Sequence, residues 1–289
     1  MKAGRCGGRF SFMRVTSREY KVIVDGSLLA DVDAALSDIF DDIGDLARAV
    51  GLGVAEKFDA KDPNERTILF LDTPDCTLRE NGLLLRQRVK RKNGKTEYTL
   101  KCRTEDRYIA AGKDLSPGAG LKHASKLEED VGVPFVSRFS HSTTVELDDN
   151  DKLAGENFPE ALSAAARLFP AVLSVHHDGL LCPHETALAP VNGLKVFERV
   201  FTGPLLRFPK GLDRRSSTMG TVALILWSKG KKGRILTAEF SFRCEDDNEA
   251  FSPELASAAR RFFEGLQHQD WTRPEALTKT QYMYGGREH

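Results

Sequence analysis

The sequence predicts an α+β protein in which antiparallel strands close into one β-barrel with helices at its periphery. Short strand patterns come in two batches, one in each half of the chain, and a helical segment accompanies each batch. No linker rich in Ser, Gly or Pro separates the batches. One barrel built from both halves therefore explains the pattern more economically than two small domains do.

The strands and helix of the first half follow from local patterns. Residues 17–25 alternate as a strand, and residues 28–50 place apolar side chains at helical spacing, with Gly51 to end the helix. Further strands are expected in a charged and β-branched stretch whose Asn93-Gly94 pair indicates a hairpin turn. These strands are 65–73, 83–92, 96–106 and 126–135.

The second half of the chain again combines predicted strands with helical segments. Residues 159–169 are expected to be helical, and strands are expected at 194–203, 218–230 and 233–246. A final helix is predicted over 252–269, because Ser252 suits the N-cap and Pro253 the first helical position. We expect residues 1–14 to be a disordered tail and 15–289 one domain, with a helical insert around 132–194.

Composition limits the classes of function. The 289 residues are 40 % hydrophobic and 29 % charged, which is ordinary for a soluble globular protein with a sizeable core. Basic and acidic side chains number 42 each, so the formal net charge is zero. The protein is therefore not of the uniformly basic kind that binds nucleic acid, and any anion site must come from local segregation of charge.

The cysteines and the hydropathy indicate a cytoplasmic protein. The five cysteines are scattered, odd in number and without a CxxC pair, which predicts reduced thiols. No apolar run approaches the roughly 20 residues that a membrane span needs. We expect neither a nucleic-acid nor a membrane partner, and the sequence is compatible with a homodimer. The cysteines are Cys6, Cys76, Cys102, Cys182 and Cys244.

Charged side chains recur two apart on the predicted strands and so share one face of each. Two neighbouring strands carry basic rows, and two other strands carry acidic positions. On several of these strands the opposite face is apolar, as Tyr98, Leu100 and Cys102 illustrate. The rows are Arg86, Arg88 and Lys90; Thr99, Lys101 and Arg103; Glu19 and Lys21; Lys126, Glu128 and Asp130; Glu239, Ser241 and Arg243.

Two interpretations of these rows are open. Alternating charge on an antiparallel strand is most often a solvated face, and a sandwich with wet outer faces has the same pattern. However, basic rows across one hairpin repel each other unless an anion lies between them. Arginine and lysine suit phosphate oxygens, while carboxylates on facing strands suit Mg²⁺ or Mn²⁺.

Residues 68–103 carry an aromatic-Leu-Asp-Thr segment, an Leu-Arg-x-Arg strand and a Thr-x-Lys-x-Arg strand in order. This run resembles the CYTH superfamily of triphosphate tunnel metalloenzymes. The KLEEDV run at 126–131 resembles the family's next, acidic strand. LTAEFSF at 236–242 resembles its closing strand and KTQYMYG at 279–285 its basic-aromatic tail. Residues 132–194 have no counterpart that we can assign.

The resemblance implies a closed, eight-stranded antiparallel tunnel that hydrolyses a triphosphate compound, either inorganic tripolyphosphate or an organic triphosphate. It implies Mg²⁺ or Mn²⁺ as cofactor and Glu128 and Lys21 as catalytic residues. Its implied phosphate ligands are Lys21, Arg86, Arg88, Lys101, Arg103 and Arg199. Its implied metal ligands are Glu19, Glu128, Asp130 and Glu239.

Two departures from the family pattern leave a second function open. The first carboxylate of the family's opening strand is Ser17 here, and one of its closing strand is Ser241. Fewer carboxylates weaken a site for a hard cation. A tunnel that binds polyphosphate or a nucleotide without hydrolysing it is therefore an alternative. A third, a structural β-domain with solvated charges, requires Arg86, Arg88 and Lys101 to point outward.

Overall fold

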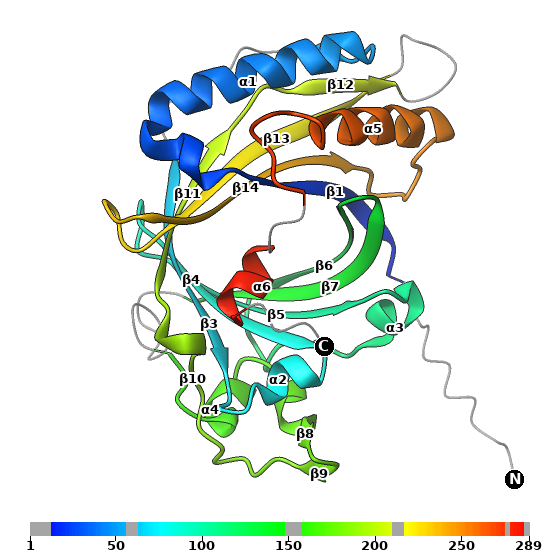
Figure 1. The fold of residues 1–289 in the computed structure, drawn as a ribbon. Coiled ribbons are helices and arrows are strands. Elements are labelled where there is room, and N and C mark those ends of the chain that lie inside the picture. The colour runs from blue at the N-terminus through cyan, green and yellow to red at the C-terminus, as the bar shows by residue number, and fades with distance from the viewer. Residues whose placement is uncertain (1–12, 56–62, 148–157, 210–216, 275–277, 286–289) are drawn as a thin grey trace, which may run out of the picture.

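The structure is a computed structural model that describes residues 13–55, 63–147, 158–209, 217–274 and 278–285. Strands from both halves of the chain form one closed barrel (Figure 1). Most of the expected N-terminal tail lies outside the described residues, as does Cys6. The other four cysteines are free. No helix in the described ranges combines the length and the apolarity that crossing a membrane requires.

Nine strands close the barrel, each pairing with the next and the last with the first. Around the ring they are β3 (Asn64–Asp72), β4 (Leu83–Lys90), β5 (Thr96–Thr104), β7 (Val136–Leu147), β6 (His123–Gly132), β1 (Val15–Val24), β14 (Ile235–Glu245), β13 (Ser217–Ser228) and β11 (Val196–Thr202).

The closed barrel is confirmed, but the expectation of eight antiparallel strands is wrong in two respects. The ring has nine strands, and β1 pairs with β6 in parallel while the other neighbours are antiparallel. A parallel pair needs a long crossover, here the chain between β1 and β6, and local alternation does not reveal it.

The additional strand is β7, which lies at the start of the segment expected to be a helical insert. Its residues alternate between small polar side chains such as Ser140 and Ser142 and outward side chains such as Val145. Both of its faces carry hydroxyl groups, which concealed the period of two. Its β-branched Thr143, Thr144 and Val145 favour a strand and were the available indication.

Short strands and helices are attached to the nine-stranded ring. β12 (Leu206–Pro209) and β2 (Gly53–Val54) extend the sheet beyond β13, β10 (Ala189–Pro190) pairs with β3, and β8 (His176–His177) pairs with β9 (Leu180–Leu181). The helices are α1 (Val32–Ala49), α2 (Thr77–Glu80), α3 (Arg107–Gly112), α4 (Leu162–Ala166), α5 (Pro253–Leu266) and α6 (Lys279–Met283). The 3-10 turns are η1 (Gly26–Ala30), η2 (Pro170–Ser174) and η3 (Val191–Gly193).

The larger outer core lies between the barrel wall and two helices. α1 and α5 pack over β1, β13 and β14 (Figure 1), and Phe240 and Phe242 are fully buried beneath them. The predicted helices are present with shorter ends. Asp31 caps α1, so the preceding residues form η1, and Ser252 caps α5 as predicted.

A second outer core covers the opposite wall. The expected helix at 159–169 forms as α4, followed by η2. These turns bury Leu85, Tyr98 and Leu100 on the outward faces of β4 and β5. The apolar faces of β4 and β5 are therefore required outside the barrel, and their charged faces must turn inward.

The C-terminal helix α6 lies within the outline of the ring (Figure 1). Met283 and Tyr284 pack with Phe70 and Trp227 in a third apolar cluster. The Tyr284 hydroxyl donates to Asp72 at 3.0 Å, which anchors the helix to the end of β3. This apolar cluster fills part of the barrel interior and leaves the charged rows to line the rest.

Candidate functional site

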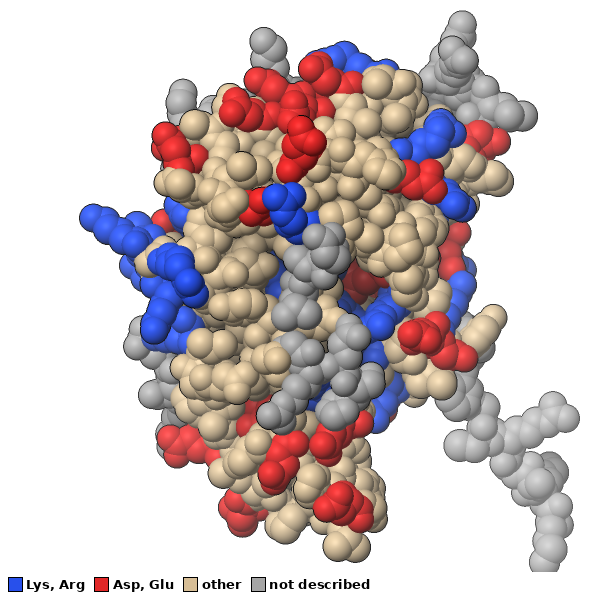
Figure 2. Space-filling view, in the orientation of Figure 1, with Lys and Arg blue, Asp and Glu red and all other residues tan. Residues whose placement is uncertain are grey.

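The charged rows face the interior of the barrel, which we call the lumen. Residues of β4 and β5 that alternate with the outer core contact charged partners on the next strand but one: Arg88 lies 3.9 Å from Glu198 on β11, and Lys101 lies 3.2 Å from Asp130 on β6. The structural β-domain required these side chains to point outward. Their position argues against that alternative, and Figure 2 shows Lys and Arg side chains in the central hollow.

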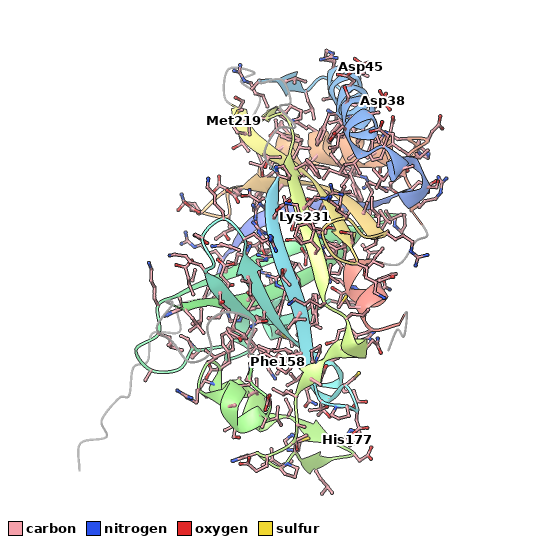
Figure 3. All side chains as sticks on the ribbon, turned by 90° about the vertical axis from the view of Figure 1, so that its left-hand side faces the viewer. Asp38, Asp45, Phe158, His177, Met219 and Lys231 are labelled. Atoms are coloured by element: carbon pink, nitrogen blue, oxygen red, sulfur yellow. The ribbon has the colours of Figure 1, made fainter. Side chains whose placement is uncertain are left out.

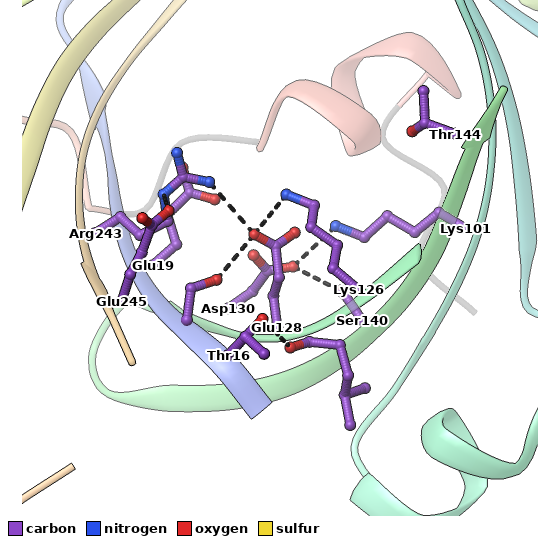
Figure 4. Close-up of polar contacts among 12 residues, drawn as sticks. Thr16, Glu19, Lys101, Lys126, Glu128, Asp130, Ser140, Thr144, Arg243 and Glu245 are labelled. Carbon is purple, nitrogen blue, oxygen red and sulfur yellow. Dashed lines mark hydrogen bonds and ion pairs between the residues drawn. The ribbon is translucent and has the colours of Figure 1, made fainter. Parts of the chain in front are cut away.

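Asp130 is the hub of one charged cluster (Figure 4). Its carboxylate accepts from Lys21 Nζ at 2.6 Å, Arg103 Nη2 at 2.8 Å and Lys101 Nζ at 3.2 Å. The Ser140 hydroxyl adds a hydrogen bond at 2.6 Å. Strands β1, β5, β6 and β7 each supply one or more of these groups, so the pairing of these four consecutive strands assembles the cluster. Sequence analysis predicted the charged members and missed Ser140.

The cluster shifts the pKa values of its members in opposite directions. Burial favours a neutral carboxyl, but Lys21, 2.9 Å away, lowers the pKa of Glu19 to about 2. Burial likewise opposes the charge on Asp130, yet Lys101 and the other cations hold its pKa well below the usual range. For Lys101 burial dominates over Asp130 and lowers the pKa to about 8. Lys101 therefore loses its proton more easily than an ordinary lysine does.

Glu128 lies beside this cluster on β6 (Figure 4). Its Oε1 accepts from the Ser17 hydroxyl at 3.0 Å and lies 2.7 Å from Lys126 Nζ. Arg243 on β14 approaches to 3.5 Å. Ser17, one of the two departures from the family pattern, thus holds a carboxylate by a hydrogen bond in place of contributing one.

A second cluster centres on Glu198, which sequence analysis did not single out. Trp227 Nε1 donates to it at 2.9 Å, and Arg66 lies 3.3 Å away. Burial would raise the pKa of Glu198, but Arg88 and the other cations lower it to about 2. Alternation along β11 was the available indication, because Glu198 lies on the face opposite the outer-core residue Phe201.

Arg86 is the least neutralised cation of the lumen. Its guanidinium contacts the Thr99 hydroxyl at 3.4 Å, and its buried Nε finds no acceptor in the part of the chain that the structure describes. Among the described residues no carboxylate lies within ion-pair distance of it. Burial, reinforced by the positive charge of Arg88, lowers its pKa to about 9. A buried arginine without a counter-charge is costly, and a bound anion would remove that cost.

Arg199 does not belong to this site. It opposes Leu226 of the outer core across the β11–β13 pair, and its guanidinium lies 5.8 Å from the Phe201 ring. The structure therefore places it on the outer wall, and its assignment as a lumen phosphate ligand needs correction. Neighbouring residues of a strand point to opposite faces, so Glu198 and Arg199 cannot share the lumen.

Glu239 is neutralised by the C-terminal helix. Lys279 Nζ lies 2.9 Å from its carboxylate and 5.4 Å from the centre of the Trp227 ring. Helix α6 thus contributes a cation as well as an apolar surface to the interior. The basic-aromatic tail expected at 279–285 does reach the lumen.

The four carboxylates predicted to bind metal have the right donor chemistry, but cations of the chain already occupy their oxygens. Each is held by at least one cation of the chain itself: Glu19 and Asp130 by Lys21, Glu128 by Lys126 and Glu239 by Lys279. Within the described ranges, no three acidic, His or Cys side chains converge as a metal site would require. In this arrangement the residues do not fit Mg²⁺ or Mn²⁺, and we derive no chemical step through a metal.

No protein-family profile and no curated protein sequence matches the chain. Its structure is similar to that of a proposed adenylyl cyclase of Hippeastrum for which a dominant triphosphatase activity is described. That similarity has 14 % identity and a TM-score of 0.45, and it covers 95 % of this chain and 98 % of the other.

A proposed adenylate cyclase of Bacillus halodurans matches with 14 % identity and a TM-score of 0.43, covering 93 % of this chain and 96 % of that one. One of Vibrio parahaemolyticus matches with 11 % identity and a TM-score of 0.37, covering 94 % and 99 %.

Proposed function

We propose that the lumen binds the phosphate chain of a triphosphate or polyphosphate compound. The observation that carries the proposal is Arg86, a buried cation beside Arg88. Among the described residues it contacts a hydroxyl group and no carboxylate. A polyanion is the ligand that such a wall favours, because its charge offsets both the desolvation of the arginines and their mutual repulsion.

The two charged clusters suit a ligand with several phosphates. Lys21, Lys101 and Arg103 converge on the single carboxylate of Asp130, which occupies the position that a phosphate oxygen would take among them. Arg86 and Arg88 supply further cations along β4. A ligand that engages both groups would hold its phosphates in line, and such positioning supplies much of the rate of phosphoryl transfer.

The reaction we propose is hydrolysis of the terminal phosphoanhydride. Glu128 is the base candidate, since its buried carboxylate lies among Ser17, Lys126 and Arg243 and can accept a hydrogen bond from the attacking water. Lys21 would stabilise the charge that develops on the phosphate oxygens. A requirement for Mg²⁺ or Mn²⁺ stays a prediction.

A binding module without catalysis is the second candidate. It is favoured by Ser17, which replaces a carboxylate, and by the internal pairing of every carboxylate that the metal would need. The two candidates share the phosphate-binding wall and differ only in turnover.

Phosphate release and binding of tripolyphosphate distinguish them. Both are measured with Mg²⁺, with Mn²⁺ and with EDTA for the natural protein, Arg86→Ala, Glu128→Gln and the control Arg261→Gln, an exposed cation on α5. We expect Arg86→Ala to weaken binding about 10-fold or more, as loss of a charge-assisted contact does. Glu128→Gln should abolish turnover and retain binding.

Each candidate has an outcome that excludes it. Turnover that Glu128→Gln abolishes establishes the hydrolase, and loss of that turnover in EDTA tests the predicted metal requirement. Binding without turnover in any condition establishes the binding module. If tripolyphosphate binds no more weakly to Arg86→Ala than to Arg261→Gln, the lumen is not the phosphate site and both candidates fail.

A further inference from the structure

A cavity of about 540 Å³ lies on the outer wall of the barrel, between η1 and the turn that joins β13 to β14. Its apolar floor is formed by Leu29, Val32 and Ile235. Its charged lining is entirely basic: Arg199, Lys231, Lys232 and Arg234. Figure 3 labels Lys231 on the face turned toward the viewer, and the basic side chains at the left edge of Figure 2 belong to the same side.

Arg199 is the anchor of this cavity. Its Nε is buried and has no hydrogen-bond acceptor within the described ranges, and its ring contact with Phe201 neutralises no charge. Among the described residues, no carboxylate lies within ion-pair distance of its guanidinium. Buried polar groups are normally satisfied, so a partly buried guanidinium that faces a basic cavity indicates an absent anionic partner.

The carboxylates around the cavity already form ion pairs or hydrogen bonds with other groups. Glu65 lies 3.3 Å from Lys231 and 3.7 Å from Arg91, and so offsets part of one lysine's charge. Asp25 accepts from the backbone and hydroxyl of Ser27, and Asp31 caps α1. Lys232 and Arg234 are exposed, and no carboxylate of the residues that the structure describes lies within ion-pair distance of either. The cavity therefore keeps a net positive lining.

We propose that this cavity is a second anion site, which binds a compact soluble phosphate such as inorganic phosphate or pyrophosphate. The guanidinium of Arg199 would form the inner contact and the turn 231–234 the outer one. The strands β11 and β13 separate it from the lumen, because Glu198 and Arg199 point to opposite sides of the same wall. The site is thus independent of the function proposed for the lumen.

Isothermal titration with pyrophosphate tests the site in a chain whose lumen has been disabled. Arg86→Ala/Lys101→Ala is the background, so that any remaining binding comes from elsewhere. We expect this background to bind one pyrophosphate per chain. Adding Arg199→Gln should weaken that binding by about 10-fold or more, while adding the control Arg261→Gln should change it by less than about twofold.

A second variant guards against a folding defect at the partly buried Arg199. Lys232→Gln/Arg234→Gln changes only exposed side chains, and it should also weaken pyrophosphate binding while leaving the melting temperature unchanged. The proposal is overturned if the background binds no pyrophosphate or if neither set of variants weakens the binding more than Arg261→Gln does. Binding to vesicles containing phosphatidate, without binding of free pyrophosphate, would overturn it equally, because the ligand would then be a lipid headgroup.

Discussion

At the scale of single residues, the cations of the lumen differ in how far nearby carboxylates offset the cost of burying their charge. Lys21 lies between two carboxylates, and although burial opposes its charge, Asp130 and Glu19 raise its pKa. Lys101 and Arg86 are not compensated in this way, and burial lowers their pKa values to about 8 and about 9. The cations that are worst satisfied in the free protein gain most from an anion.

Affinity for tripolyphosphate should therefore fall as the pH rises above about 8, the pKa of Lys101 in the free protein. Below that pH Lys101 is already charged and contributes fully. Above it, binding must include proton uptake, because the anion raises the pKa of Lys101, and affinity falls by up to about 10-fold per pH unit.

Titrations from pH 7 to 9.5, in buffers of different ionisation enthalpy, measure both the affinity and the proton uptake. Lys101→Arg is the matched control, since an arginine at that position keeps its charge over this range. It should move the decline to higher pH. The same decline in both proteins would show that Lys101 does not titrate on binding.

At the scale of elements, α4 and η2 support the barrel wall from outside. They cover the outward faces of β4, β5 and β7, on which Tyr98 and Leu100 are fully buried. Part of the unassigned segment 132–194 is thus the barrel strand β7, and another part is this outer cover. The cover lies on the opposite side of the wall from Lys101 and Arg86, which distinguishes it from a gate over the lumen.

Phe169→Ala should destabilise the protein by about 3–5 kcal/mol, because this fully buried ring fills the core under the cover. Chemical denaturation measures the change. The affinity of the folded protein for tripolyphosphate should stay within about twofold, since the ring does not contact the lumen. Leu180→Ala, at a side chain 74 % exposed, is the control and should leave stability nearly unchanged. Lost affinity in a still-folded Phe169→Ala would assign the cover a role in binding.

At the scale of the whole molecule, the net charge is zero, but basic and acidic side chains gather on different parts of the surface. Two basic hairpin turns meet at one end of the wall: Glu65 bridges Arg91, after β4, to Lys231, after β13. Exposed lysines such as Lys92 and Lys229 add to this rim. Acidic side chains lie on the helices above and around the lower segments in Figure 2. Such a rim raises the local concentration of anions near the tunnel.

The double variant Lys92→Gln/Lys229→Gln should slow the association of tripolyphosphate severalfold at low salt and leave dissociation nearly unchanged, because rim charges steer encounter more than they hold the complex. Stopped-flow measurements at about 20 mM and about 200 mM salt, a range over which screening strengthens, give both rates. Arg207→Gln/Arg261→Gln removes the same charge from β12 and α5 and should have little effect. Equal slowing in both double variants would exclude steering by the rim.

Local patterns determined much of this protein. Alternation predicted which face of β4, β5 and β6 carries charge. Helical spacing predicted α1 and α5, and Ser252 was predicted as the cap of α5, because these are properties of neighbouring residues. The predicted lumen residues of β1, β4, β5, β6 and β14 do face the interior.

Only the tertiary structure decided how the faces combine. The parallel pairing of β1 with β6, the inclusion of Ser140 in the Asp130 cluster and the opposite positions of Glu198 and Arg199 depend on contacts between distant segments. Sequence alternation separates two faces but does not say which is inside; the outer helices decide that by covering the apolar face. The sequence thus determined the charged rows, and packing against α1, α5 and the cover turned those rows into a lumen.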